Sequence, residues 1–490
     1  MSKPAPSAPP LKRFLQFIDG AFVESDSGGW HPCIYPGTAQ AWAEIPRGNA
    51  RDAVAAVAAA KRAFADPAWS KLTATQRGRL LYALADLTAA NVATLAELET
   101  RDNGKRYAES AGAIGLVPSW LRYFAGLADK VGGSVIPVDK PNVLNFTRSE
   151  PLGVVAAIIP WNSPLWLLAW KLGPALAAGN TIVIKPSEYA STSTLEFARL
   201  VEQAGFPKGV VNVVTGVGPE VGQALVDDPD VAMVSFTGSE AVGRRVAEAA
   251  GAKLKRVVLE LGGKSPQIVF DDAPLEEAVS GVMLGIFTSN GQSCVAGSRL
   301  LLQSSVYDRF MAAFLEKAGG KSFGDPMDQA TEVAPLANEP QFRKALDYIR
   351  IAEGEGAHRV LGGGVASDRP GYFVQPTVFT DVTASMRIAQ EEVFGPVLAV
   401  IRFETESEAI ELANSTSYGL AAGVWTQDLR RALRVSEQVK AGTVWVNTYR
   451  GFDPGSPAGG YKSSGIGREN GHDALNDYLQ TKSVWISTGQ

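Results

Sequence analysis

Residues 151–263 alternate short, β-branched apolar runs with segments of helix length, and this pattern restricts the fold more than any other feature of the chain. The apolar runs cover residues 154–159, 181–185, 210–214, 233–236 and 256–261. Strands of this kind, alternating with helices, predict a parallel, doubly wound α/β sheet. In such sheets, ligands bind at the carboxyl ends of the strands.

The predicted strand ends carry polar and glycine residues, which indicates a nucleotide-binding crevice. These residues are Trp161, Asn162, Lys185, Glu188, Gly216, Gly218, Gly238, Ser239 and Glu260. A conventional dinucleotide fingerprint is missing, because the turn at 160–164 has no glycine and one residue too many separates Gly218 from Gly222. Residues 236–239, before a predicted helix from Glu240, are the better phosphate candidate, and a capped turn with Ser239 as N-cap is the alternative.

A second α/β unit is expected from residue 265 to about residue 461. Strand-like runs lie at 267–270, 299–302, 397–403, 422–425 and 443–447, with helices at 273–287 and 407–414. The pattern therefore predicts two α/β units in one chain.

The ends of the chain carry further signals. Asn49 is the expected N-cap of an alanine-rich helix that runs to Phe64, and residues 75–100 predict one or two more helices. The alternating tail at 483–487 and the segment 131–147 predict an intersubunit sheet, or an edge strand of their own domain. Residues 1–10, rich in proline, alanine and serine, are expected to be a disordered leader.

The composition excludes several classes of partner. The chain has 490 residues, a net charge of -5 and no basic block, so no nucleic-acid partner is expected. Its most apolar stretch, 152–170, is interrupted by prolines well short of the roughly 20 residues of a spanning helix, and predicts a buried strand and turn with no membrane segment. Three scattered histidines give no metal-ligand spacing, so no metal site is expected.

Cysteine usage points to a reactive thiol. The chain has only Cys33 and Cys294, which cannot form a disulfide framework, and its N-terminus does not look like a signal peptide. A reducing, cytoplasmic location is therefore expected. Free cysteines are often small buried hydrophobes, but the glycine and polar residues at 290–293 give Cys294 the polar setting that a reactive thiolate needs.

Eight motifs in order resemble those of the aldehyde dehydrogenase superfamily, over nearly the whole chain. They are Pro-Trp-Asn at 160–162, Trp-Lys-Leu-Gly-Pro-Ala-Leu at 170–176, Lys-Pro-Ser-Glu at 185–188, Phe-Thr-Gly-Ser at 236–239, Leu-Glu-Leu-Gly-Gly-Lys at 259–264, Gly-Gln-Ser-Cys at 291–294, Glu-Glu-Val-Phe-Gly-Pro at 391–396 and Gly-Tyr-Lys at 460–462. The resemblance implies a Rossmann-type doubly wound NAD-binding domain, a second α/β catalytic domain and a small β oligomerisation segment.

The resemblance also implies domain boundaries. The NAD-binding domain would cover 1–130 and 152–263, the catalytic domain 264–462, and the oligomerisation segment 131–151 and 463–490. A homodimer or a homotetramer is expected.

By the same resemblance, Cys294 is expected to be the nucleophile, Glu260 the general base and Asn162 the side-chain donor of the oxyanion hole. A thiolate can attack an aldehyde carbonyl, fixed donors can stabilise the oxyanion, and a carboxylate can activate the water that hydrolyses the thioester. Lys171 and Glu469 match positions assigned to a proton path in part of the family, and a structural role is the alternative for both.

The cofactor implied by the resemblance is NAD. Glu188 favours it over NADP, because a carboxylate there can accept hydrogen bonds from the ribose hydroxyls but would repel a 2′-phosphate. The residues expected around the cofactor are Ile158, Ile159, Pro160, Trp161, Lys185, Ser187, Glu188, Gly218, Gly222, Phe236, Gly238, Ser239, Leu261, Gly262, Glu392 and Phe394.

Departures from the family pattern bear on the substrate. Where the family has Pro-Phe-Gly-Gly, this chain has Ala458 in place of the aromatic residue, and Ser163 and Thr288 are also small. These predict a wide pocket for a bulky or aromatic aldehyde, and Arg450 either meets an anionic group of the substrate or faces solvent. The expected pocket residues are Ser163, Trp166, Trp170, Phe287, Thr288, Ser293, Val295, Arg450, Phe452 and Ala458.

Two alternatives remain to hydrolytic oxidation. A coenzyme A-acylating aldehyde dehydrogenase would pass the thioester to coenzyme A, although Glu260 argues against it by activating water. A binding or structural protein could keep this fold without turnover.

Overall fold

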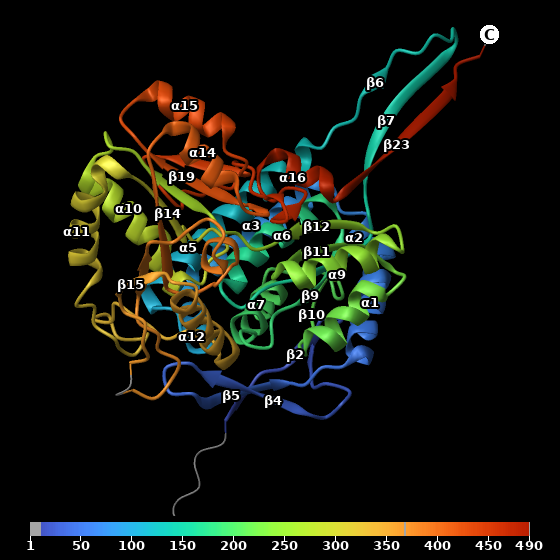
Figure 1. Cartoon of the computed structure of the whole chain (residues 1–490). Coiled ribbons are helices and arrows are strands. Elements are labelled where there is room, and N and C mark those ends of the chain that lie inside the picture. The colour runs from blue at the N-terminus through green and yellow to red at the C-terminus, as the bar shows by residue number, and fades with distance from the viewer. Residues whose placement is uncertain (1–10, 367–368, 490) are drawn as a thin grey trace, which may run out of the picture.

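An eight-stranded sheet organises the first half of the molecule, in a computed structural model that describes residues 11–366 and 369–489 (Figure 1). The leader expected at 1–10 lies outside the described residues. The strand order is β22 (Gly465–Ile466), β12 (Arg256–Glu260), β11 (Val231–Thr237), β8 (Val154–Ile158), β9 (Thr181–Lys185), β10 (Val211–Val213), β2 (Gln16–Ile18) and β3 (Ala21–Val23). The strands from β12 to β10 are parallel, and antiparallel strands close both edges.

Helices cover both faces of this sheet, so its β-branched strands are buried on both sides. Val154 and Ala156 of β8 pack with α1 (Ala50–Ala65), whereas Val155 and Ala157 pack in the opposite cluster with α6 (Pro164–Ala178). The remaining helices of this half are α2 (Pro67–Ser70), α3 (Ala74–Ala90), α4 (Val92–Asn103), α5 (Tyr107–Leu127), η1 (Ala128–Lys130), α7 (Thr192–Gln203), η2 (Gly218–Gly222), α8 (Gln223–Asp227) and α9 (Glu240–Gly251). The predicted doubly wound sheet is confirmed.

Local signals account for the helix boundaries. Asn49 caps α1 in a capping box with Asp52, as predicted, and the 75–100 region is two helices that meet at Asn91. The interpretation of 152–170 as a strand and turn is wrong for its second half, which is the start of α6. Pro164 stands at the first helical position, where proline is tolerated, and the apolar run continues to a left-handed cap at Gly179.

The second α/β unit is a seven-stranded sheet. Its order is β15 (His358–Leu361), β16 (Thr377–Thr380), β17 (Val397–Phe403), β14 (Arg299–Gln303), β13 (Pro266–Val269), β19 (Ala421–Trp425) and β20 (Thr443–Val446). Its helices are α10 (Leu275–Phe287), η4 (Ser304–Val306), α11 (Tyr307–Ala318), α12 (Glu339–Gly354), α13 (Arg387–Gln390), α14 (Glu406–Asn414) and α15 (Leu429–Gln438). The five predicted strands are present, and β15 and β16 extend the sheet beyond them.

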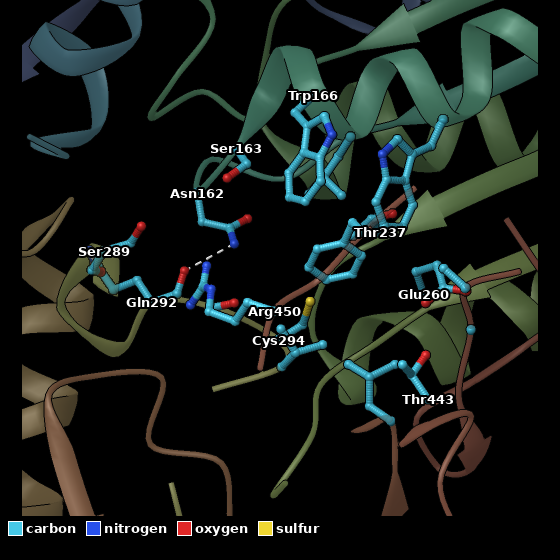
Figure 2. A pocket seen from close by; sticks show the side chains of 18 residues that line it. Asn162, Ser163, Trp166, Thr237, Glu260, Ser289, Gln292, Cys294, Thr443 and Arg450 are labelled. Carbon is cyan, nitrogen blue, oxygen red and sulfur yellow. Dashed lines mark hydrogen bonds between the residues drawn. The ribbon is translucent and has the colours of Figure 1, made fainter. Parts of the chain in front are cut away.

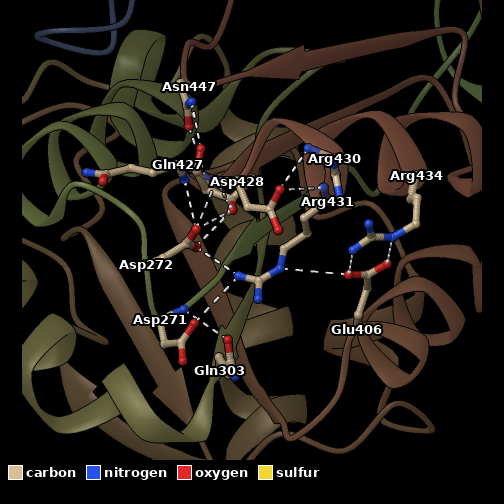
Figure 3. A network of polar contacts seen from close by, with 11 residues as sticks. Asp271, Asp272, Gln303, Glu406, Gln427, Asp428, Arg430, Arg431, Arg434 and Asn447 are labelled. Atoms are coloured by element: carbon tan, nitrogen blue, oxygen red, sulfur yellow. Dashed lines mark hydrogen bonds and ion pairs between the residues drawn. The ribbon is translucent and has the colours of Figure 1, made fainter.

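A polar network fastens α15 to the carboxyl end of β13 (Figure 3). The Asp272 carboxylate accepts hydrogen bonds from the Thr426 hydroxyl at 2.8 Å and from the backbone N–H groups of residues 427 and 428 at 3.0 Å. Arg431 pairs with Asp272 at 2.9 Å and with Glu406 of α14 at 3.7 Å. One carboxylate therefore closes a turn and holds a helix.

Smaller sheets complete the fold. The tail strand β23 (Leu479–Ser487) pairs with β7 (Val143–Pro151), which also pairs with β6 (Val135–Ile136), and Figure 1 shows this sheet projecting from the body. The two segments predicted to form strands together do so. The other small strands and the last helix are β1 (Lys12–Arg13), β4 (Trp30–Tyr35), β5 (Gln40–Pro46), β18 (Tyr418–Gly419), β21 (Tyr461–Lys462) and α16 (Gly471–Asp477). Among the described residues, no helix is both long and apolar enough to span a bilayer.

Candidate active site

The loop that carries Cys294 has an unusual backbone. After α10, η3 (Thr288–Gly291) places Ser289, Asn290 and Gly291 at φ of 53°, 52° and 71°, in the left-handed region. A Cβ on Gly291 would lie 2.1 Å from the Gly395 carbonyl oxygen, so only glycine fits there. Non-glycine residues in this region are strained, and such strain concentrates at functional sites.

Gln292 fixes this loop from two directions. Its side-chain Oε1 accepts a hydrogen bond from the backbone N–H of Ala337 at 2.9 Å, and its Nε2 donates to the Ser289 carbonyl at 3.3 Å. Its backbone carbonyl accepts a hydrogen bond from Asn162 Nδ2 at 3.0 Å. The turn that follows β8 and the loop of Cys294 are thereby joined.

Cys294, Asn162 and Glu260 line one cavity, although they come from three distant segments (Figure 2). Other predicted pocket residues line the same cavity: Ser163, Trp166, Trp170, Ser293, Val295, Arg450, Phe452 and Ala458. Trp166 and Phe452 meet edge to face at 5.1 Å between ring centroids, so aromatic surfaces form one wall. Cys294 is half-buried as a residue and lines this cavity, so a ligand in the cavity can reach it.

Two ionisable groups of the cavity, the Cys294 thiol and the Glu260 carboxyl, have raised pKa values, which favours their uncharged forms. Burial, followed by the charges of Glu260 and Glu392, raises the pKa of the Cys294 thiol to about 12. Burial, followed by the charge of Glu469, raises the pKa of Glu260 well above its usual range, while Lys171 opposes this shift. Glu260 Oε1 has no hydrogen-bond partner in the described residues, so it can accept a proton or a hydrogen bond from a ligand.

Lys171 and Glu469 lie behind Glu260 and form a fully buried ion pair. Ser235 of β11 joins them, because its hydroxyl accepts from Lys171 Nζ at 3.1 Å and donates to Glu469 Oε1 at 3.2 Å. Neither side chain lines the cavity itself, and their charges change the pKa of Glu260 in opposite directions.

A second cavity meets the first at Cys294 and Asn162. Of the residues predicted around a cofactor, it is lined by Pro160, Trp161, Gly238, Ser239, Leu261, Gly262, Glu392 and Phe394. The rings of Trp161 and Phe394 meet at 5.3 Å, nearly perpendicular. Phe394 has a left-handed φ of 59°, and its carbonyl accepts a hydrogen bond from Gln341 Nε2 at 2.8 Å.

Glu392 is held at the wall of this second cavity by the backbone N–H of Gly263, which donates to it at 3.0 Å. Burial raises the pKa of Glu392, and the Gly263 hydrogen bond opposes that shift. The arrangement leaves the rest of the carboxylate available to a hydroxyl donor.

The remaining predicted cofactor residues lie at neighbouring strand ends, outside this second cavity. They are Ile158, Ile159, Lys185, Ser187, Glu188, Gly218, Gly222 and Phe236. Lys185 is buried and pairs with the half-buried Glu188 at 3.4 Å, so it is not a surface charge. A Cβ on Gly218 would meet nothing within 4 Å, so space is open beside it.

The sheet order explains why these groups meet. From β8 the chain runs outward through β9 and β10, then returns to place β11 and β12 on the other side of β8. The loops after β8 and β11 therefore flank the topological switch point, where ligands of doubly wound sheets bind. Trp161 and Asn162 follow β8, and Gly238 and Ser239 follow β11.

Comparison with known proteins places this geometry in a family. The model of the "Aldehyde dehydrogenase family" matches residues 22–484. An aldehyde dehydrogenase of Emericella nidulans is 46% identical over 474 residues, 96% of this chain and 95% of that protein. The chain belongs to the aldehyde dehydrogenase family. The resemblance predicted from the eight motifs is thereby confirmed.

Solved structures of aldehyde dehydrogenases share the whole fold. The NAD+ complex of the Bacillus cereus enzyme is similar with a TM-score of 0.96 and 44% identity, covering 98% of this chain and 97% of that one. A betaine aldehyde dehydrogenase of Staphylococcus aureus, in complex with NAD+, has a TM-score of 0.95 and 41% identity, covering 97% and 95%. These findings support oxidation of an aldehyde with a nicotinamide cofactor.

Two pocket residues predicted for this aldehyde dehydrogenase do not reach the cavity of Cys294. Phe287 and Thr288 line a separate hollow with Met283 and Leu284. Phe287 ends α10 with its ring 6.2 Å from that of Phe314 on α11. The left-handed turn at 289–291 redirects the chain between these residues and Cys294, so residues that are close in sequence line different hollows.

Several residues of the two cavities were not predicted. Leu167, Thr237, Ser289, Gln292, Leu420, Thr443 and Gly459 line the first, and Gln341 and Lys344 of α12 line the second. Thr237 and Gln292 stand inside motifs that were quoted for the resemblance, so adjacency to a motif was a usable signal. No motif marks Gln341 or Lys344.

Proposed function

We propose that this enzyme oxidises a bulky or aromatic aldehyde to the carboxylic acid with NAD, through covalent chemistry at Cys294. The observation that carries the proposal is the placement of Cys294, Asn162 and Glu260 around one cavity that opens into a second at the switch point of the sheet. One cavity then receives the aldehyde and the other the cofactor.

The residues of the first cavity supply the covalent steps. The thiol proton of Cys294 passes to water in the cavity, and the sulfur bonds to the aldehyde carbon as the C=O π bond breaks, which leaves the carbonyl oxygen as an oxyanion. Asn162 Nδ2 uses one N–H on the Gln292 carbonyl, which leaves the other for that oxyanion beside the backbone N–H of Cys294. The chemistry that a bound nicotinamide supplies is acceptance of a hydride from the Cys294 adduct.

Glu260 suits the hydrolytic step. Its carboxylate takes a proton from water as the water oxygen bonds to the thioester carbon, and the carbon–sulfur bond breaks to release the acid. The pKa of Glu260 is raised by burial, so the carboxylate is a stronger base than an exposed glutamate. Water activation favours hydrolysis over transfer to coenzyme A.

The residues present fit a dinucleotide. Open space beside Gly218, backbone N–H groups at the start of α9 and the buried Lys185 beside Glu188 would hold its adenosine and pyrophosphate. Glu392 would accept a ribose hydroxyl in the second cavity. Glu188 favours NAD, because it would repel a 2′-phosphate, and comparable catalytic efficiency with NADP would contradict this preference.

Cavity shape supports the substrate class. Ser163 and Ala458 contribute small side chains to the wall, while Trp166 and Phe452 present aromatic surfaces. Stacking on those rings favours a ring-bearing aldehyde. Acetaldehyde turnover far better than that of every ring-bearing aldehyde would contradict this proposal.

Further proposals concern organisation. We retain the domain boundaries drawn from the resemblance, a cytoplasmic location and a homodimer or homotetramer. The projecting sheet supports association, because Val135, Leu144, Trp485 and Ile486 are exposed on it. Sedimentation equilibrium of the purified chain would test it, and a monomer at micromolar concentration would contradict it.

The deciding experiment follows NADH formation over a panel of aldehydes, with Cys294→Ala as the control variant. Wild-type enzyme is expected to form NADH and the carboxylic acid, with no dependence on coenzyme A. Undiminished NADH formation by Cys294→Ala would exclude the covalent mechanism. Acyl-coenzyme A as the main product would favour the acylating alternative.

A further inference from the structure

Arg450 is held rigidly at the wall of the aldehyde cavity. It follows β20 with a left-handed φ of 62°, a conformation that L-residues rarely adopt. The Tyr449 hydroxyl donates to the Val295 carbonyl at 2.9 Å, and Trp445 Nε1 donates to the Gly451 carbonyl at 2.9 Å. Both neighbours of Arg450 are therefore fastened, one of them beside Cys294. Figure 2 shows the guanidinium on the side of the cavity where Asn162 and Gln292 lie, away from Glu260.

The Arg450 guanidinium lacks a partner within the described part of the chain. Its Nη1 is buried without a hydrogen-bond acceptor, and Arg450 takes part in none of the ion pairs there. Among the carboxylates, Glu109 has the largest electrostatic effect on the pKa of Arg450. Glu109 is already paired with Arg106 at 2.8 Å and accepts a hydrogen bond from the backbone N–H of Ser289 at 3.0 Å. Burial lowers the pKa of Arg450, but a guanidinium remains charged in proteins. Arg450 as a whole is half-buried, but a buried donor atom of a charged group without an acceptor is costly, so this geometry favours an anion.

Another group of the cavity also favours an acceptor on the ligand. Ser163 Oγ accepts a hydrogen bond from Lys105 Nζ at 2.8 Å, which leaves the Ser163 O–H free to donate into the cavity. Ser163 and Arg450 are therefore both donors at the cavity wall, and Arg450 is the charged one.

Aromatic walls alone would also suit a cationic substrate, because a cation is attracted to the faces of tryptophan and phenylalanine rings. Arg450 argues against that occupant, because its charge lies in the same cavity and would repel a quaternary ammonium group. Lys105 adds a second positive charge behind Ser163, although Glu99 offsets it at 3.5 Å. An anionic substrate is therefore favoured over a cationic one.

We propose that Arg450 binds a carboxylate carried by the aldehyde substrate, remote from the reacting carbonyl. The planar guanidinium matches a carboxylate with two parallel N–H···O bonds, which fixes orientation as well as position. The substrate class is then a bulky or aromatic aldehyde with a second, anionic end. This inference rests on the proposed function, and it makes Arg450 a specificity-determining residue.

The test compares three aldehydes of similar shape: para-carboxybenzaldehyde, para-methylbenzaldehyde and para-trimethylammoniobenzaldehyde. Wild-type kcat/KM is expected to be about ten- to a hundredfold higher for the carboxylate than for the methyl compound, the range for a hydrogen-bonded charge. Arg450→Met is expected to lose this preference, mainly through a higher KM for the carboxylate. Arg450→Lys should retain part of it, and Arg309→Met, which removes an exposed arginine of α11, should retain all of it.

Several outcomes would overturn the proposal. Wild-type enzyme that oxidises para-methylbenzaldehyde as efficiently as the carboxylate, or that prefers the ammonium compound, would exclude it while the proposed function stands. An equal loss for all three aldehydes in Arg450→Met would place Arg450 in the chemistry of Cys294 instead. Absence of NADH with every aldehyde would instead remove the proposed function.

Inhibition of the wild-type enzyme tests the proposal even if the Arg450→Met variant fails to fold. para-Carbamoylbenzoate should inhibit the wild-type enzyme competitively, and at least tenfold more strongly than para-methylbenzamide, since only para-carbamoylbenzoate carries an anion. Equal inhibition by the two amides would overturn the proposal. Quenching of tryptophan fluorescence by the two amides measures the same preference without turnover.

Discussion

The side-chain amide of Asn162 donates to the backbone carbonyl of Gln292 at 3.0 Å, which ties the strand end of the first sheet to the loop of Cys294. The same amide nitrogen has a second N–H, and Asn162 lines the cavity that holds the thiol. One side chain therefore positions the loop and, in the proposed mechanism, also offers a donor to the reacting oxygen.

Replacing Asn162 separates these two effects. Asn162→Ala should lower kcat on the order of a hundredfold or more, because an oxyanion donor is lost. Asn162→Asp keeps the size of the side chain but places a carboxylate near the oxyanion, so it should be at least as damaging. Steady-state kinetics with a good aldehyde measure both, with circular dichroism as the check of folding. Turnover within a few-fold of wild type would contradict the assigned role.

Glu260→Gln should slow the release of product selectively. The first turnover should still form a burst of NADH, and the steady rate should then fall by about a hundredfold or more, because no base activates water. In the wild-type enzyme the steady rate should rise with pH through an apparent pKa above the ordinary 4.5, since the pKa of Glu260 is raised and only its ionised form accepts a proton. Stopped-flow measurement of NADH across pH checks both statements. A variant that loses the burst as well would move Glu260 to an earlier step.

Much of the first sheet could be predicted from the sequence because its strands are buried on both faces. The run 181–185 has three β-branched apolar residues between Thr181 and Lys185, and the strand there has the predicted bounds. The strands β15 and β16 were missed. β15 lies at the edge of its sheet and is short and partly exposed, whereas β16 is an inner, buried strand of only four residues. Edge strands are specified by the neighbours that they pair with, rather than by their own composition.

The site was predictable where chemistry resides in motifs, and less so where packing decides. Cys294, Glu260 and Asn162 were found through short local patterns and do share a cavity. Thr288 was predicted from its match to a family position, but it lines a separate hollow, and a left-handed turn lies between it and Cys294. Lys344 of α12 reaches the second cavity only because α12 packs there, and nothing in its local sequence indicates this.

The buried pair of Lys171 and Glu469 should tune the acidic limb of the pH profile in opposite directions. Glu469 raises the pKa of Glu260 and Lys171 lowers it, so Lys171→Met should move the limb to higher pH and Glu469→Gln to lower pH. Each variant also leaves one buried group without its partner, which should lower the free energy of unfolding by about 3–5 kcal/mol. Rate profiles across pH and urea denaturation provide the measurements. Shifts in the same direction would show that the pair does not act through charge.

Asp272→Ala should destabilise the enzyme without altering its chemistry. The variant removes the acceptor of two backbone N–H groups, one hydroxyl and Arg431, so the free energy of unfolding should fall by about 2–3 kcal/mol. Asp272 follows the end of β13, whereas Gly262 of the second cavity precedes its start, so the network lies at the opposite end of the sheet. Unchanged kcat/KM with a lower urea midpoint is expected, and a large loss of kcat/KM would link the network to the site.

Alkylation of Cys294 should report its electrostatic surroundings directly. Because the pKa of the thiol is raised to about 12, reaction of the enzyme with iodoacetamide should be slow near neutrality. The rate should rise about tenfold for each unit by which the pH increases toward that pKa. Glu260 contributes to the shift, so Glu260→Gln should lower the pKa of the thiol and speed alkylation at a fixed pH. Cys294→Ala is the control, because Cys33 is buried and burial also raises the pKa of its thiol. Mass spectrometry of the modified peptide gives the rates. Slower alkylation in Glu260→Gln would mean that Glu260 removes the proton of Cys294 in the resting enzyme, and its charge would then assist the thiolate rather than oppose it.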